Sequence, residues 1–119
     1  MAQQKQETAI QNAIRAELSQ VGIVRRNNVG TYITPYGAPI KIGIPGEADL
    51  TLFAYGGKTI FIEVKTNKGK QSKAQKHFED VATTLGFEYI VMRSREDAVR
   101  LVKRLRGEIG GKAEELNTE

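Results

Sequence analysis

The feature that most constrains the fold is the stretch ADLTLFA-YGG-KTIFIEVKT, residues 48–66. Two runs rich in β-branched and aromatic residues flank a glycine pair, which is typical of an antiparallel β-hairpin. Side chains alternate along a strand, so Glu63 and Lys65 share one face with Phe61, while Ile62 and Val64 share the other. Two charged groups therefore project together from a segment that otherwise reads as buried, where desolvation of either charge is unfavourable.

The length of the hairpin loop decides which face Asp49 joins. A two-residue turn at the glycine pair would pair residue 55 with residue 58 and place Asp49 opposite Val64. A three-residue loop over 55–57, with Gly57 in the left-handed region, would pair residue 54 with residue 58 and place Asp49 opposite Glu63. We predict the three-residue loop, and therefore two carboxylates that face each other.

The remaining pattern predicts three helices and several short strands. Apolar periodicity and capping residues predict helices over 6–21, 72–85 and 95–106, and short β-prone runs predict strands near 31–34, 39–42 and 87–92. Ser72 followed by Gln75 fits a capping box. The order predicts an α/β sandwich around a mixed sheet, with a parallel crossover into 87–92. We assign residues 1–106 to one domain and 107–119 to a flexible acidic tail.

Composition excludes several classes of protein. A chain of 119 residues has room for one domain, and no apolar run approaches the roughly 18 residues of a membrane helix. The polar start MAQQKQET lacks the apolar stretch of a secretory signal, so we expect a cytoplasmic location and no membrane partner. The chain has no cysteine, which removes disulfides, thiol nucleophiles and cysteine-ligated zinc.

The basic residues are concentrated. The formal net charge is +4, but residues 1–106 alone carry 17 basic and 10 acidic side chains, a net charge of +7. The excess lies in KTNKGKQSKAQK (65–76), which has no acidic residue, and in RSREDAVRLVKRLR (93–106). This distribution indicates an anionic partner, most commonly nucleic acid, although solvated surface alone can also explain such runs.

Two facing carboxylates need a positive neighbour. Their repulsion grows as they are desolvated, so something cationic must lie between Asp49 and Glu63. Lys65 could serve in part, but a divalent cation fits better, because Mg²⁺ accepts carboxylate oxygens together with water. Glu7, on the inward stripe of the first helix, is a candidate third carboxylate, although acidic residues in a first turn also stabilise the helix dipole without any ligand. Lys65 would then orient or deprotonate a water molecule.

The ordered motifs resemble a known family. The segments PGEADLTLF and IEVKT, followed by SKAQKHF, resemble the PD-(D/E)XK nucleases, and more narrowly the VRR-NUC (virus-type replication-repair nuclease) branch. The likeness runs from about residue 7 to residue 105, and RRNNVG is similar to an Arg-Asn-Gly element of the family. Ala48 departs from the pattern, since the family usually has proline there. The resemblance implies a restriction-endonuclease-like α/β fold, with an α-β-β-β-α-β core and a C-terminal helix.

The resemblance also implies site residues. Asp49, Glu63 and Lys65 match the motif, Glu7 matches the glutamate of the first helix, and Gln75 matches the glutamine after the motif. Glu7, Asp49, Glu63 and the Val64 carbonyl would hold Mg²⁺, with Mn²⁺ able to substitute. The expected phosphate contacts are basic residues on both sides of the motif: Arg25, Arg26, Lys68, Lys70, Lys73 and Lys76.

The expected function is therefore metal-dependent cleavage of DNA. Phosphate contacts carry no base information, so we expect a structure-selective endonuclease that acts on branched DNA such as a four-way (Holliday) junction. Paired cuts at a junction need two active sites, and the resemblance implies a homodimer. We expect no small-molecule cofactor. The alternative is a nucleic-acid-binding module of the same fold without catalysis.

Overall fold

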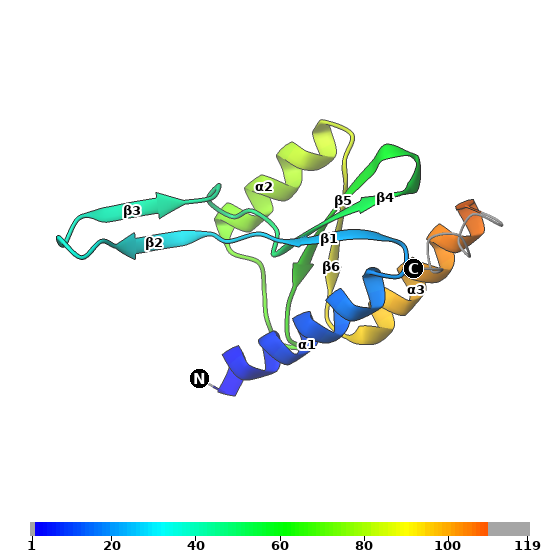
Figure 1. The fold of residues 1–119 in the computed structure, drawn as a ribbon, viewed down its shortest axis with the longest axis horizontal. Helices are drawn as coiled ribbons and strands as arrows, with labels where there is room; N and C mark the ends of the chain where they lie inside the picture. Colours follow the sequence, from blue (N-terminus) through cyan, green and yellow to red (C-terminus); the bar gives the residue numbers. More distant parts are fainter. Residues whose placement is uncertain (1, 110–119) are drawn as a thin grey trace.

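The structure is a computed structural model that describes residues 2–109. Its centre is a four-stranded mixed sheet in the order β1-β4-β5-β6 (Figure 1). β1, β4 and β5 are antiparallel neighbours, while β5 and β6 run parallel, as the predicted crossover requires. The strands are β1 (Gly22–Arg26), β4 (Leu50–Ala54), β5 (Lys58–Val64) and β6 (Glu88–Met92).

Helices cover both faces of this sheet. α1 (Ala2–Leu18) and α3 (Arg95–Ile109) lie on one face, and α2 (Lys73–Thr84) lies on the other (Figure 1). The core forms between the sheet and the helices α1 and α3, where Ile14, Leu18, Ile62 and Val64 are fully buried. The even-numbered positions of β5 therefore face the core, and the odd-numbered positions face α2. The predicted α/β sandwich with a mixed sheet is confirmed.

The bounds of two helices differ from the sequence-based prediction by several residues. α1 covers Ala2–Leu18 rather than 6–21, and Val21 is buried beyond the end of the helix. α3 continues through Gly107 to Ile109, so the predicted end at residue 106 is wrong. A glycine inside a helix costs only about 1 kcal/mol, and Glu108 forms an ion pair with Lys58 that holds the last turn against β5. Most of the predicted acidic tail, residues 110–119, lies outside the described residues.

The strand β1 was not predicted. It lies at the edge of the sheet, and its side chains are exposed or only partly buried, so its hydrophobic alternation is weak.

No helix between residues 2 and 109 is long and apolar enough to cross a membrane.

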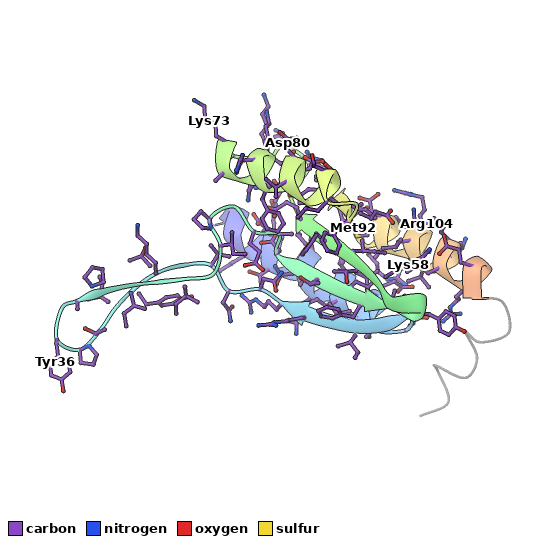
Figure 2. The ribbon with its side chains drawn as sticks, turned by 90° about the horizontal axis from the view of Figure 1, so that it is seen from above. Tyr36, Lys58, Lys73, Asp80, Met92 and Arg104 are labelled. Atoms are coloured by element: carbon purple, nitrogen blue, oxygen red, sulfur yellow. The ribbon has the colours of Figure 1, made fainter. Side chains whose placement is uncertain are left out.

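A second hairpin projects away from the sheet. β2 (Gly30–Ile33) and β3 (Pro39–Ile42) pair with each other as a separate two-stranded sheet, close to the predicted strands at 31–34 and 39–42. Figure 1 shows this hairpin extending to one side of the body, and Figure 2 shows Tyr36 at its tip. We call residues 27–46 the arm.

The arm returns to the body through a tight loop before β4. Gly46 has φ of +77°, and a Cβ at this position would lie 2.1 Å from the Ala74 carbonyl oxygen in the first turn of α2. The loop therefore packs directly on the start of α2, and only glycine fits there. This contact fixes the segment that leads into Asp49.

We expect Gly46→Ala to lower the free energy of unfolding by about 3 kcal/mol or more, because it adds a backbone clash to the strain of a positive φ. Gly37→Ala is the matched control, since Gly37 has φ of +82° with nothing within 4 Å of a Cβ. It should lose only about 1 kcal/mol. Urea denaturation of both variants measures the difference, and equal losses would contradict the proposed packing.

Candidate active site

The register of the β4–β5 hairpin brings the two carboxylates together. The connecting turn covers Tyr55–Gly57, and Ala54 pairs with Lys58. Gly57 has φ of +75°, as the predicted three-residue loop requires. Leu50 pairs with Ile62, so the preceding residue, Asp49, lies opposite Glu63. The predicted register is confirmed, and both carboxylates lie on the face of the sheet that α2 covers.

Glu63 is fully buried and its two oxygens have different surroundings. Its Oε2 accepts a hydrogen bond from Gln75 Nε2 at 2.7 Å and lies 3.5 Å from Lys65 Nζ. Its Oε1 is buried, and no donor among the described residues reaches it. A buried carboxylate oxygen without a partner is unfavourable, and it is a common mark of a site that binds something else.

Gln75 connects α2 to this carboxylate. Its Oε1 accepts a hydrogen bond from the Ser72 N–H at 2.8 Å, and Ser72 Oγ accepts one from the Gln75 N–H at 3.1 Å. The predicted capping box is therefore present. The amide Nε2 of the same side chain binds Glu63, so Gln75 caps the helix and orients the carboxylate at the same time.

Asp49 is held by backbone groups on both sides. Its Oδ2 accepts a hydrogen bond from the Val64 N–H at 2.7 Å, and its carbonyl accepts one from the Asn27 N–H at 2.8 Å. The Asn27 side chain donates to the Ala48 carbonyl at 2.9 Å and to Thr51 Oγ1 at 2.8 Å. These bonds fix the backbone at Ala48, just before β4. A proline at this position would stiffen the backbone there instead. Sequence reasoning gave Asn27 no role, although it lies in the RRNNVG segment.

Burial shifts the protonation of both carboxylates. Desolvation, and then the negative charge of Asp49, raise the pKa of Glu63 to about 8. Desolvation also raises the pKa of Asp49, against the hydrogen bond from Val64 and the positive charges of Lys65 and Arg26. In the bare site the pair therefore tends to keep a proton that free carboxylates release at neutral pH.

The donor set fits a divalent cation only in part. Glu63 Oε1 is available, and Asp49 uses Oδ2 for the Val64 N–H. Within residues 2–109, however, no three His, Cys, Asp or Glu side chains lie close enough together to hold a metal ion. The structure thus brings Asp49 and Glu63 together but does not add Glu7 as a third carboxylate. Mg²⁺ retains water ligands and is often bound by one or two carboxylates plus substrate phosphate, so two carboxylates suffice for such a site.

A cavity of about 360 Å³ opens beside Asp49. Asp49 and Gln75 line it together with Arg26, Glu47 and the arm residue Tyr32. Glu47, which lies close enough in sequence to compete with Asp49 as a ligand, accepts a hydrogen bond from the Ile44 N–H. The site is therefore open to solvent on the side from which the arm projects.

The predicted phosphate contacts are all exposed basic side chains, and one of them, Arg26, lines the cavity beside Asp49. None of them forms an ion pair with another residue of the described chain. They come from the end of β1, from the loop after β5, and from α2: Arg25, Arg26, Lys68, Lys70, Lys73 and Lys76.

Arg93 holds the loop that follows Lys65. Its Nη1 donates to the carbonyl oxygens of Thr66 at 2.6 Å and Gly69 at 2.8 Å. Arg93 also lines a cavity of about 740 Å³ with Lys68, and none of the acidic residues between positions 2 and 109 lines this cavity. Along the sequence, Arg93 stands out only as part of a basic run. In the fold it comes directly after β6, which lies next to β5, and this position places Arg93 beside the loop that follows Lys65.

Comparison with known proteins supports this fold. A solved structure described as a VRR_NUC domain matches with a TM-score of 0.60 and 21% sequence identity, covering 82% of this chain and 95% of that chain. No protein-family model matches the sequence, and no curated protein does. The chain therefore has the fold of a VRR_NUC domain, as the sequence motifs implied.

We expect the stability of the protein without divalent cations to fall as pH rises from about 4.5 to about 8. The folded chain keeps a proton on Glu63 that the unfolded chain, with a pKa near 4.5, releases. Deprotonation therefore favours unfolding over this window, by up to about 1.4 kcal/mol per pH unit. Urea denaturation in EDTA at a series of pH values measures this slope.

Glu63→Gln is the comparison for this experiment. In this variant Glu63 no longer contributes to the pH dependence of the free energy of unfolding, and only Asp49 does. Its stability should therefore depend less on pH. An identical slope in both proteins would show that Glu63 does not hold the proton.

Proposed function

We propose that the chain is a divalent-metal-dependent endonuclease that hydrolyses phosphodiester bonds in DNA. The observation that carries this proposal is the pair formed by Asp49 and the fully buried Glu63, with one carboxylate oxygen free of donors and the Lys65 amine 3.5 Å from the other. A purely structural carboxylate in such a place would be paired with donors at both oxygens. The fold shared with a VRR_NUC domain points to the same chemistry.

The proposed cation is Mg²⁺, with Mn²⁺ able to replace it. Asp49 and Glu63 would hold it, with the Val64 carbonyl as a further proposed ligand, whereas Glu7 lies outside this carboxylate group. When bound, such a cation supplies Lewis-acid chemistry, because it lowers the pKa of water and neutralises phosphate charge. Its positive charge would also replace the proton that the carboxylate pair otherwise keeps.

The surrounding side chains have distinct tasks. Gln75 binds Glu63 Oε2 and so leaves Oε1 as the oxygen available to a ligand. The Lys65 amine, whose side chain is only 13% exposed, donates to a phosphate oxygen or orients the attacking water molecule. Asn27 and Arg93 make no hydrogen bond to the side chain of Asp49 or Glu63, and both act by positioning. Asn27 fixes the backbone at Asp49, and Arg93 fixes the loop after Lys65.

The exposed lysines would bind the DNA backbone on either side of the cut. Contacts to phosphates position a duplex without reading its sequence, so we propose structure-selective cutting on branched DNA such as a four-way junction. One chain has one such site, and paired cuts at a junction would therefore require two copies.

We expect Lys65→Ala to slow Mg²⁺-dependent cleavage at least ~10²-fold, and Glu63→Ala to abolish it, while both variants bind DNA nearly as well as the parent protein. The assay is nicking of supercoiled plasmid and cutting of junction, flap and splayed-arm oligonucleotides. Glu88→Gln is a matched control, because Glu88 pairs with Arg104 at the opposite end of β5 and β6 from the site. This variant should cut normally.

Cleavage assays with and without EDTA distinguish a metal-dependent nuclease from a protein that only binds DNA. Cleavage that survives EDTA, or that never appears with Mg²⁺ or Mn²⁺, would reject the proposal. Intact DNA binding without any cleavage would favour the non-catalytic module instead.

We expect Lys68→Gln to reduce the slope of log K against log salt concentration for DNA binding by about 1, because one phosphate contact is lost. Lys103→Gln is the control, since Lys103 is exposed on α3, on the opposite face of the sheet from α2. Fluorescence anisotropy over a salt series measures both slopes. An equal loss in the two variants would mean that the basic surface is not specific to the site.

A further inference from the structure

The arm exposes more large apolar side chains than any other part of the described chain. Seven of the thirteen exposed large hydrophobic residues between positions 5 and 108 belong to it. None of its residues belongs to the buried core, and Tyr36 at its tip is 97% exposed (Figure 2). A two-stranded hairpin whose apolar face stays uncovered is only marginally stable in water, so this arm is suited to pack against something outside the chain.

The base of the arm forms one wall of the cavity beside Asp49. Val29 and Tyr32 line this cavity together with Asp49 and Gln75. A molecule that occupies the cavity therefore lies against these two arm side chains. A DNA strand whose phosphate reaches Asp49 must pass the base of the arm, and this step rests on the proposed nuclease function.

The strand register continues this apolar surface along the arm. Tyr32 pairs with Ile40, and Gly30 pairs with Ile42. Directly paired residues project to the same side, so Tyr32, Ile40 and Ile42 form one apolar face. This face therefore leads from the cavity that contains Asp49 toward the tip of the arm.

The tip is a compact turn that projects Tyr36. The Gly37 N–H donates to the Thr34 carbonyl at 2.9 Å, and the Thr34 N–H donates to the Ala38 carbonyl at 2.9 Å. Pro35 restricts the backbone directly before Tyr36. The exposed aromatic ring therefore has a firm support, which reduces the conformational entropy that the ring loses when it binds.

Charge and side-chain type favour contact with bases rather than with phosphates. Residues 27–46 contain a single charged side chain, Lys41, and no acidic one, in a chain that is 27% charged. DNA would not repel such an arm, but one lysine is too little to bind the backbone by charge. Aromatic and apolar side chains bind the faces of bases instead, by stacking on them or by entering between two base steps.

We propose that the arm enters the base stack of the DNA bound at Asp49 and Glu63, with the Tyr36 ring stacked on a base. Entry is most favourable where the stack is already interrupted, as at a branch point. Each residue of a strand adds about 3.3 Å, so the tip lies about 10 Å beyond Tyr32, a length that spans only a few base pairs. The arm therefore sets the distance between the branch and the phosphate that is cut.

Substitutions of two exposed tyrosines test the proposal. Tyr36→Ala removes the ring at the tip, and Tyr36→Phe keeps the ring without its hydroxyl. Tyr55→Ala is the matched control, because Tyr55 is also exposed but lies in the turn after β4, at the opposite end of that strand from Asp49. Fluorescence anisotropy in EDTA measures the affinity of each protein for a splayed-arm DNA and for a continuous duplex of the same length. Circular dichroism verifies that each variant is folded, which we expect because Tyr36 is almost fully exposed.

Tyr36→Ala should weaken binding to the splayed-arm DNA about 10-fold and binding to the continuous duplex less than about 2-fold, because stacking needs an accessible base. Tyr36→Phe and Tyr55→Ala should bind both DNAs like the parent protein. Three results would each overturn the proposal: equal losses on the two DNAs, no loss on the splayed-arm DNA, or a loss for Tyr36→Phe as large as that for Tyr36→Ala.

Sedimentation equilibrium tests whether the arm binds protein instead. Tyr36→Ala should leave the mass of the protein unchanged, with one chain weighing 13.2 kDa. If Tyr36→Ala lowers the mass and keeps the affinity for splayed-arm DNA, the arm binds a second copy of the chain and the proposal is wrong.

The position of the cuts separates this inference from the proposed function. With Mg²⁺, the parent protein should cut splayed-arm DNA a few base pairs from the branch, and Tyr36→Ala should spread the cuts over more positions. If the parent protein binds this DNA through Tyr36 but never cuts it, the proposed function fails and the role of the arm stands. If the parent protein cuts, and Tyr36→Ala changes neither the affinity nor the cut positions, the role of the arm fails and the proposed function stands.

Discussion

The central constraint on this structure is that two carboxylates lie together where little water reaches them. Glu63 is fully buried between the sheet and α2, and Asp49 lies opposite it. Such a pair is unfavourable unless a proton, an amine or a cation compensates for its charge. The chain supplies Lys65 and Gln75 at one oxygen of Glu63 and leaves the other oxygen without a donor. The incomplete compensation is the strongest sign that this part of the fold serves chemistry rather than stability.

Each part of the site is fixed by a different element of the fold. Asn27, next to the end of β1, holds the backbone at Asp49, and Gln75 joins the start of α2 to Glu63. Arg93, after β6, holds the loop that follows Lys65. These residues come from segments far apart in the sequence, so the site requires the whole sheet to form. Because the supporting groups lie at strand and helix ends, they can hold the side chains of the candidate site within narrow limits.

The sequence was most informative where local rules decide the structure. Alternation and loop length predicted that Asp49 faces Glu63, because a hairpin register follows from three loop residues. Apolar periodicity did not reveal β1, because its edge position leaves its side chains exposed or only partly buried. Nor did it reveal the continuation of α3 past Gly107, which a contact between Lys58 and Glu108 supports. The roles of Asn27 and Arg93 depend on contacts across the sheet, and a pattern along the chain does not contain that information. Nor did the sequence show that Glu7 stays outside the carboxylate pair.

The double role of Gln75 restricts what this position can tolerate. A capping box accepts glutamate as readily as glutamine, because either side chain can receive the N-cap N–H. Here the far end of the side chain must also donate a hydrogen to Glu63, which a glutamate side chain cannot do once ionised. A glutamate would add another negative charge beside two carboxylates that burial already makes unfavourable to ionise. The carboxylate of Glu63 beneath the helix therefore requires glutamine at position 75. The capping box alone would accept either amino acid.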